Sequence, residues 1–416
     1  MERYTVISAD CHGGGNIPDY RPYLDSQHLD AFDAWEREFK NPYSDLQDDS
    51  AGRNWDHARR LSELEADGVV AEVIFPNTIP PFFPTPSLLN QPPPANAGDL
   101  DLRWAGLHAH NRWLADFCAA APNRRAGIAQ ILLHDVDRAT NEVRWAKEAG
   151  LTGGVLLPGA PPGSGVPPLY APDYEPLWSV CAELGMPINH HSGSAAPDYG
   201  PYPAAQVMFL VEVTWWAHRT LWHLIYAGVL ERHPDLQLVF TEQGTAWLPE
   251  QLQTLDYYYT RMRAAAGSGS QEAIYGADVM AKLSLKPSEY WARQCHVGSS
   301  FIRQHEVPLR ARVGVDKIMW GSDFPHREGC WPFSRQHLRL AFAGVDPVEV
   351  QAMVGGNAAR VYSFDLDALA PIAARVGPRV EDVAQPLPRD EIPREALRCP
   401  AFAAAYTGSD KASGGR

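Results

Sequence analysis

Short, nearly continuous apolar runs recur eight times along the chain, and longer stretches separate most of them. Runs rich in Val, Ile, Leu and Phe that do not alternate with polar residues are typical of parallel strands covered on both faces. Two of the separating stretches have helical periodicity, namely residues 55–68, which end at Gly68, and residues 217–236, which end near Pro234. The eight runs are residues 4–10, 69–76, 125–132, 152–159, 186–191, 236–242, 295–300 and 317–323.

Eight strands that alternate with helices predict an α/β fold, a distorted (β/α)8 TIM barrel with loop insertions and a C-terminal extension. The loop before residue 103 and the segment 255–294 are insertions on this plan. Residues 77–94 are too rich in proline to form a regular helix, because proline removes a backbone donor. The pattern fades after residue 364, so we expect a barrel over residues 1–380 and a partly disordered extension over residues 381–416.

Composition narrows the class of protein. Of 416 residues, 45% are hydrophobic and 21% are charged, which suits a soluble protein with a large core. The net charge of -14 argues against nucleic acid, because phosphate binding relies on clustered Lys and Arg. Six scattered cysteines give no disulfide or zinc-binding pattern, and neither a secretion signal nor a membrane span is visible. We therefore expect a cytoplasmic protein that acts on a small molecule, without membrane or nucleic-acid partners.

Potential metal ligands close four of the eight runs. The active site of such a barrel lies at the C-terminal ends of its strands, where these ends converge. An isolated Asp at a strand end is more often a turn residue, but convergence of several ligand types favours a metal site. Imidazole with carboxylate is a ligand set of zinc, manganese or iron(II). The residues are Asp10 and His12 after the first run, His190 and His191 in the fifth, Glu242 in the sixth and Asp323 in the eighth.

Spacing refines this set. Asp10 and His12, two positions apart on a strand, point to the same side and can share one ion. His190 and His191 point to opposite faces, so one of them is expected to pack in the core or to support a metal ligand without binding the metal itself.

At these positions the chain resembles the amidohydrolase superfamily, within it the branch of aminocarboxymuconate semialdehyde and γ-resorcylate decarboxylases. The resemblance implies Asp10 and His12 as the paired ligands of the first strand, His191 as the ligand of the fifth and Asp323 as that of the eighth. It implies a mononuclear site, because "TGGVLLPG" lacks the modified lysine that binds a second metal in many relatives. The motifs are "ISADCH" (7–12), "GVVAEVIFP" (68–76), "MPINHHSG" (186–193), "LERHPDLQLVFTEQG" (230–244), "KPSEYWARQ" (286–294), "IMWGSDFPH" (318–326) and "GGNAARVY" (355–362).

Further residues are expected near the metal. We expect one divalent ion, zinc first, with manganese or iron as alternatives. Glu242 stands where the related decarboxylases carry the histidine of an H-x-G motif, so it either moves protons or binds the metal. His326 orients Asp323, contacts substrate or only caps its loop. Arg59, ahead of Arg60, is the candidate clamp for a substrate carboxylate, with surface ion pairing as the alternative.

The favoured activity is non-oxidative decarboxylation of a small aromatic or unsaturated carboxylic acid, with Asp323 or Glu242 as the proton donor. Metal-dependent hydrolysis of an amide, ester or lactone is the alternative, in which Asp323 takes a proton from water. A catalytically inactive barrel that binds a partner is the third hypothesis. We also expect a homodimer or a higher homo-oligomer. Aromatic residues with helical spacing are assigned to the core or to a subunit contact; they are Trp215, Trp216, Trp222 and Tyr226.

Overall fold

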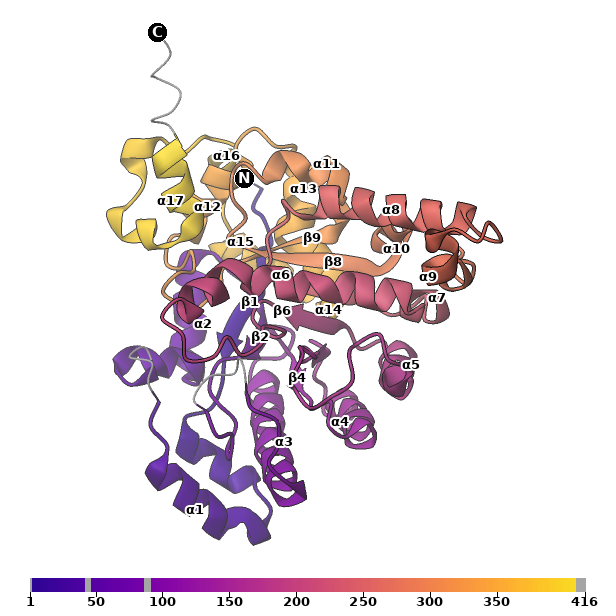
Figure 1. Ribbon diagram of the computed structural model, residues 1–416. Helices are drawn as coiled ribbons and strands as arrows, with labels where there is room; N and C mark the ends of the chain where they lie inside the picture. The colour runs from indigo at the N-terminus through magenta and orange to yellow at the C-terminus, as the bar shows by residue number, and fades with distance from the viewer. Residues whose placement is uncertain (1, 42–45, 86–90, 409–416) are drawn as a thin grey trace.

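Parallel strands with helices around them form the centre of the computed structural model, which describes residues 2–41, 46–85 and 91–408 (Figure 1). Each predicted apolar run contains or overlaps a strand, and the third run contains two. The strands are β1 (Ile7–Gly13), β2 (Ala71–Pro76), β3 (Arg125–Gly127), β4 (Ala129–Gln130), β5 (Val155–Leu156), β6 (Ile188–His191), β7 (Leu238–Thr241), β8 (Cys295–Ser300) and β9 (Ile318–Gly321).

Two parallel sheets, β1-β2-β3 and β4 to β9 in sequence order, follow one another around the barrel. They meet where β3 and β4 are separated by Ile128 alone, whose N–H donates to the carbonyl of Ile74 at 3.0 Å. The other edges of the two sheets are β1 and β9. Cys11 of β1 forms a parallel bridge with Phe324, which follows β9, and the N–H of His12 donates to the carbonyl of Phe324. This arrangement is the distorted (β/α)8 barrel that the sequence predicts.

Helices surround the strands and extend beyond them. The α-helices are α1 (Leu29–Glu38), α2 (His57–Asp67), α3 (Ala97–Ala119), α4 (Val136–Glu148), α5 (Glu175–Leu184), α6 (Ala205–Tyr226), α7 (Val229–Arg232), α8 (Leu248–Ala264), α9 (Gln271–Met280), α10 (Pro287–Gln294), α11 (Arg310–Val313), α12 (Ser334–Phe342), α13 (Pro347–Gln351), α14 (Asn357–Tyr362), α15 (Leu366–Val376), α16 (Val380–Val383) and α17 (Pro400–Gly408). Short 3-10 or π helices are η1 (Ile17–Tyr23), η2 (Ser26–His28), η4 (Asp49–Asn54), η5 (Pro172–Tyr174), η6 (Val307–Leu309), η7 (Val315–Lys317), η8 (Ala352–Gly356), η9 (Arg389–Glu391) and η10 (Arg394–Arg398). Among the described residues, none of these helices has both the length and the apolar character that crossing a membrane requires.

The two helices expected from periodicity differ in outcome. The helix expected over residues 55–68 is α2, which Asp56 caps by accepting from the N–H of Arg59 and which Gly68 ends at φ +95°. The helix expected over residues 217–236 is two helices, because α6 ends at Tyr226 and Gly228 takes φ +72° before α7. Left-handed backbone of this kind cannot continue an α-helix, so the single-helix prediction was wrong.

The loops and insertions also have defined structure. The expected insertion over residues 255–294 contains the end of α8 together with α9 and α10, which lie at one side of the molecule in Figure 1. Residues 77–85 and 91–94 form no helix, as their prolines predict, and residues 86–90 lie outside the described residues.

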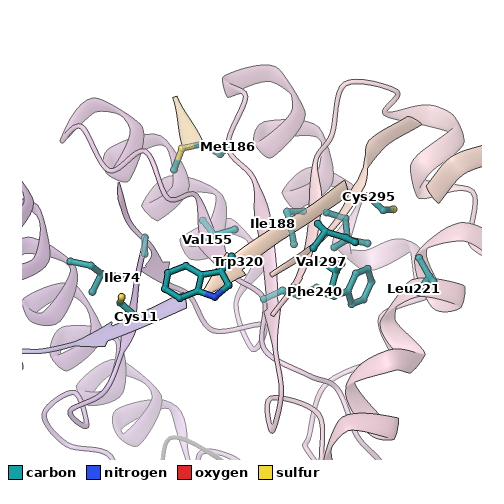
Figure 2. Close-up of a cluster of buried hydrophobic side chains, with 14 of the residues drawn as sticks. Cys11, Ile74, Val155, Met186, Ile188, Leu221, Phe240, Cys295, Val297 and Trp320 are labelled. Carbon is teal, nitrogen blue, oxygen red and sulfur yellow. The ribbon is translucent and has the colours of Figure 1, made fainter. Parts of the chain in front are cut away.

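Side chains on each strand alternate between the helices and the interior of the barrel. Ile188, Phe240 and Trp320 belong to the large cluster between strands and helices, part of which Figure 2 shows. Val239 and Met319, each one position away, belong to a second cluster inside the barrel. Residues of α14 and α15 complete that inner cluster, and the Tyr362 hydroxyl of α14 donates to Asn189 of β6 at 2.7 Å. The helices after β9 therefore close the end of the barrel opposite the C-terminal strand ends.

The segment after residue 380 packs on the barrel. It contains α16, η9, η10 and α17, and Figure 1 shows α17 beside α12. Cys399 and Phe402 are fully buried, and the ring of Phe402 lies 5.8 Å from that of His337 in α12. The disorder expected for this extension also concerns residues 409–416, which lie outside the described residues. The boundary at residue 380 stays a prediction.

Candidate metal centre

Four predicted ligands meet at the C-terminal ends of β1, β6 and β9. His12 Nε2 lies 3.3 Å from Asp10 Oδ1 and 3.3 Å from Asp323 Oδ1. His191 Nε2 lies 3.5 Å from Asp10 Oδ1. The side chains of Asp10 and Asp323 are fully buried, and those of the two histidines nearly so. The strand ends thus bring together residues that are up to 313 positions apart in the sequence.

A bulge in β1 aims the first two ligands. Ser8 pairs with Glu72 and Cys11 with Ile74, so three steps along β1 match two along β2. The extra residue shifts the alternation: Ile7 and Ala9 belong to the inner cluster, yet Cys11 belongs to the outer one. Asp10 and His12 therefore face the interior, where they contact Asp323.

Unpartnered polar atoms mark the centre of the cluster. Asp10 Oδ1, His12 Nε2, His191 Nε2 and both Asp323 oxygens are buried without a hydrogen-bond partner among the described residues. Buried polar atoms are almost always paired, so five such atoms in neighbouring side chains indicate a site that can hold a positive charge. The opposite atom of Asp10, Oδ2, accepts from the Ser300 hydroxyl.

The histidine tautomers also fit a metal. His12 Nδ1 lies 3.3 Å from the carbonyl of Pro76, and His191 Nδ1 lies 2.9 Å from that of Ser192. A carbonyl can only accept, so each Nδ1 carries the hydrogen and each Nε2 presents its lone pair to the cluster. A tetrahedron whose corners lie about 2.1 Å from its centre has edges of about 3.4 Å, close to the three distances of 3.3, 3.3 and 3.5 Å given above. Asp10, His12 and His191 therefore fit one divalent ion, and Asp323 joins this group through its contact with His12.

Burial and the neighbouring charges shift the pKa values of the residues in this cluster. Burial lowers the pKa of His12, but Asp10 and Asp323 outweigh burial and raise that pKa well above its ordinary value. Burial raises the pKa of Asp10, but the nearby imidazoles of His12 and His191 outweigh burial and hold that pKa below its ordinary value. Burial, with the charge of Asp10, raises the pKa of Asp323 to about 7. The two carboxylates and the two imidazoles therefore compete for the same protons.

Local backbone geometry positions the two acidic residues that end β7 and β9. Glu242 takes φ +56° and Asp323 takes φ +61°, conformations that are uncommon without a glycine. The N–H of Asp323 donates to the carbonyl of Asp10 at 2.8 Å, which ties the turn to β1. The inner side of β9 also requires a glycine at position 321, because a Cβ there would lie 2.6 Å from the Cβ of Asp10.

Glu242 and His326 lie beside the four ligands. A carboxylate oxygen of Glu242 lies 3.6 Å from His191 Nδ1, and the side chain is 31% exposed. Burial, together with the charges of Asp323 and Asp10, raises the pKa of Glu242 to about 8. The ring of His326 lies 4.3 Å from that of His12, and His12, Asp323 and His326 form a second group of close ligand atoms. The structure thus places both residues near the metal position.

The carboxylate clamp expected at Arg59 has no support in this structure. The guanidinium of Arg59 donates to Glu63 at 3.0 Å and to the carbonyl of Asp49 at 2.7 Å, the surface pairing that was the alternative. Its neighbour Arg60 is fully buried and donates to the carbonyl of His12 at 2.8 Å and to both oxygens of Glu72. Consecutive helix residues point about 100° apart, so only one of the two can face β1.

Sequence reasoning missed two residues of the site. Ser300, which closes β8, holds Asp10, and the only signal for it was its place at a strand end. The ring of Phe75 lies 4.8 Å from that of His191 and gives the site an apolar wall. His190 faces away from the cluster, as expected of one residue of the pair: its nitrogens lie 3.1 Å from the carbonyl of Leu157 and 3.0 Å from the hydroxyl of Thr220.

Comparison with known proteins defines the class. A family model described as amidohydrolase matches residues 56–364, and the chain belongs to this family. The protein is therefore an enzyme of the amidohydrolase superfamily, whose members use a divalent metal, and the resemblance inferred from the motifs is confirmed.

The curated relatives include γ-resorcylate decarboxylases. The enzyme of Rhizobium sp. (strain MTP-10005) is 25% identical over 271 residues, which cover 61% of this chain and 75% of that one. The enzyme of Rhodococcus jostii (strain RHA1) is 26% identical over 274 residues, with the same shares covered.

Among solved structures, 5-carboxyvanillate decarboxylase from Novosphingobium aromaticivorans, in complex with manganese and 4-hydroxy-3-methoxy-5-nitrobenzoic acid, matches with a TM-score of 0.65. Its sequence identity is 18%, and the match covers 86% of this chain and 96% of that one. 2,6-Dihydroxybenzoate decarboxylase from Rhizobium matches with a TM-score of 0.56 and 17% identity, over 88% of this chain and all of the other. At these identities the likeness shows the fold.

Proposed function

We propose that the protein is a metal-dependent decarboxylase that releases carbon dioxide from a small aromatic carboxylic acid. The observation that carries this proposal is the convergence of five unpartnered ligand atoms from Asp10, His12, His191 and Asp323 beside the carboxylate of Glu242. The curated relatives named as γ-resorcylate decarboxylases support the reaction and the aromatic class of substrate.

One divalent ion would be held by Asp10, His12, His191 and Asp323. Two imidazoles and two carboxylates suit zinc, which we propose first, and they also suit manganese and iron(II). Manganese in the complex of the 5-carboxyvanillate decarboxylase supports manganese as an alternative. When bound, the ion supplies positive charge against which a substrate carboxylate and a neighbouring oxygen can be held.

Asp323 is the proposed proton donor. Its buried carboxyl transfers a proton to the ring carbon that bears the substrate carboxylate. The bond from that carbon to the carboxylate then breaks, its electron pair returns to the ring, and carbon dioxide leaves. Asp323 is left as a carboxylate.

Glu242 and His326 support this chemistry. Glu242, which is partly exposed, returns a proton from solvent to the site. His326 lies against His12 and contacts the substrate or orients Asp323. Ser300 keeps Asp10 fixed through its oxygen that faces away from the ion.

We also propose that two copies of the chain associate through α6. Four exposed apolar side chains follow one face of this helix at spacings of three and four residues: Val207, Leu210, Val211 and Trp215. Trp222 and Tyr226, further along the helix, are partly buried against the core instead. Leu210→Glu should lower the mass measured by light scattering to that of one chain, whereas Leu366→Glu, at another exposed leucine, should leave it unchanged. Equal masses for both variants would contradict assembly through α6.

The decarboxylase proposal is tested by incubating metal-loaded protein with 2,6-dihydroxybenzoate and with 5-carboxyvanillate. Release of carbon dioxide and the matching loss of a carboxylate signal by NMR are the expected results, and Asp323→Asn should abolish both. If no carboxylic acid releases carbon dioxide while an amide, ester or lactone is cleaved, the activity is that of a hydrolase. A metal-loaded protein without turnover of any of these compounds would favour the binding-only barrel.

A further inference from the structure

A cavity of about 250 Å³ lies beside the metal centre and is lined by three arginines. Arg53 comes from η4, Arg327 from the loop after β9 and Arg398 from η10 in the C-terminal extension. Trp331 and Asn54 also line the cavity, and none of its lining residues among those described is acidic.

The guanidinium groups of Arg53 and Arg398 meet at Trp331. The guanidinium carbon of Arg53 lies 4.6 Å from the centre of the Trp331 ring. Arg398 donates from Nη2 to the carbonyl of Trp331 at 3.3 Å. Arg327 precedes Trp331 by four residues in the same loop. Three segments that are far apart in the sequence thus place cations around one tryptophan.

The nearby carboxylates leave this cavity positively charged. Arg53 donates to Glu63 at 2.8 Å, and Arg327 lies 3.5 Å from Asp48. The hydrogen bond of Arg398 goes to a backbone carbonyl, which carries no full charge. Each guanidinium has five N–H donors, and the contacts above use only a few of them. Glu63 and Asp48 offset two of the three charges, so a net positive charge remains at the cavity and attracts an anion. In a chain of net charge -14, composition alone does not explain three arginines around one cavity.

Backbone contacts connect this cavity to the metal centre. Pro325 and Arg327, both lining residues, flank His326 in the sequence. The carbonyl of Asn54 accepts from the N–H of Gly14, two residues after His12. Arg60 donates from Nη1 to the carbonyls of His12 and Arg53, at 2.8 Å each. The cavity therefore lies against the end of β1, which carries His12, and against the loop after β9, which carries His326.

We infer that this cavity is a binding site for an oxyanion, a carboxylate or a phosphate group, and that the C-terminal extension completes it through Arg398. The planar fork of a guanidinium matches the paired oxygens of both groups, and stacking on Trp331 holds the fork of Arg53 in place. The oxyanion comes from one of two sources: the far end of a molecule that also contacts the metal centre, or a free anion. This inference goes beyond decarboxylation, because it holds for any reaction at the metal.

Inorganic phosphate is the probe for the test. Isothermal titration of the metal-loaded full chain should show saturable binding of phosphate, and Arg398→Gln should weaken it roughly ten-fold or more, because a hydrogen bond to a charged group is lost. Arg394→Gln is the matched control, since Arg394 lies in the same η10 but does not line the cavity. Arg327→Gln is a second variant on another segment and should also weaken binding.

The titration separates this site from the metal centre. Phosphate held by the ion itself would bind wild-type protein and Arg398→Gln equally, and equal binding in a folded variant overturns the inference. Absence of saturable binding to the wild type overturns it as well. No turnover is measured, so failure here is distinct from failure of the proposed reaction.

Isophthalate, which has two carboxylates, identifies the source of the oxyanion. If its affinity falls both on removal of the divalent ion and in Arg398→Gln, one molecule reaches from the metal centre into the cavity. If only one of these changes lowers the affinity while phosphate still binds, the cavity holds a free anion.

Discussion

Gly321→Ala tests how closely metal affinity depends on the placement of Asp10. A Cβ at position 321 would lie 2.6 Å from the Cβ of Asp10 and 3.1 Å from its backbone nitrogen. Carbon atoms pack best about 3.5–4.0 Å apart, so Asp10 or β9 has to move by about 1 Å. Metal ligands keep their bond lengths within about 0.2 Å, which makes a shift of this size incompatible with an intact centre.

The expected magnitude follows from where the clash can relax. Without the ion, Asp10 is held by Ser300 but not by a metal, so part of the clash can relax at some cost in folding stability. With the ion bound, Asp10 is fixed and the full cost of overpacking, about 1–3 kcal/mol, falls on the metal-bound state. Converted at about 1.4 kcal/mol for each factor of ten, metal binding should weaken about 5- to 150-fold.

A competition titration against a chromophoric chelator measures this loss, with thermal unfolding recorded with and without the divalent ion. Gly356→Ala is the matched control, because Gly356 has helical dihedral angles and a Cβ there would meet the Gln351 carbonyl oxygen at 3.5 Å, an ordinary contact distance. The control should bind metal as the wild type does. A folded Gly321→Ala protein with wild-type metal affinity would refute the reasoning.

Three further changes give distinct results. His191→Ala should lose most of the bound ion by elemental analysis, whereas His190→Ala should keep the ion and lower the melting temperature, because it leaves two buried partners unpaired; loss of metal from both would contradict the assigned orientations. Glu242→Gln should reduce turnover roughly 10²-fold or more at unchanged metal content, and an unchanged rate would remove Glu242 from the chemistry. Asp67→Asn concerns stability: burial raises the pKa of Asp67 from near 3.8 to about 7. The folded state therefore holds this proton more tightly than the unfolded chain, and stability from Asp67 falls as the pH rises between these values. The melting temperature of the variant relative to the wild type should rise from about pH 5 to about pH 8, and a constant difference would contradict the buried position of the carboxyl.

The strands were predictable because their apolar character is nearly continuous and ends in Gly, Pro or polar residues. Both faces of each strand are covered, so no alternation was needed to recognise it. The interruption at Ile128 has no sequence signal, because Ile128 is itself apolar. The break after Tyr226 did have a signal, Gly228, but glycine inside a helical pattern is often tolerated.

The ligands were predictable for a different reason. The ends of parallel strands converge in a barrel, so residues at these ends are neighbours whatever their distance in sequence. The bulge that turns Asp10 and His12 inward depends on how β1 pairs with β2. This pairing cannot be read from the sequence. The choice between Arg59 and Arg60 depends on the rotation of α2 against β1, and packing of the whole barrel decides it.

Arg60 couples the metal centre to the arginine-lined cavity. Its Nη1 binds the carbonyl of His12 on one side and that of Arg53 on the other, while Glu72 neutralises it from β2. Glu72 also pairs with Arg125 at 3.3 Å, so this single buried carboxylate contacts two guanidinium groups. A buried charge that loses its partner is costly, which makes the position of Arg60 nearly invariant in the folded chain. Because the same guanidinium fixes the backbone of His12 and of Arg53, the distance between a metal-bound group and an anion near Arg53 is set by the scaffold.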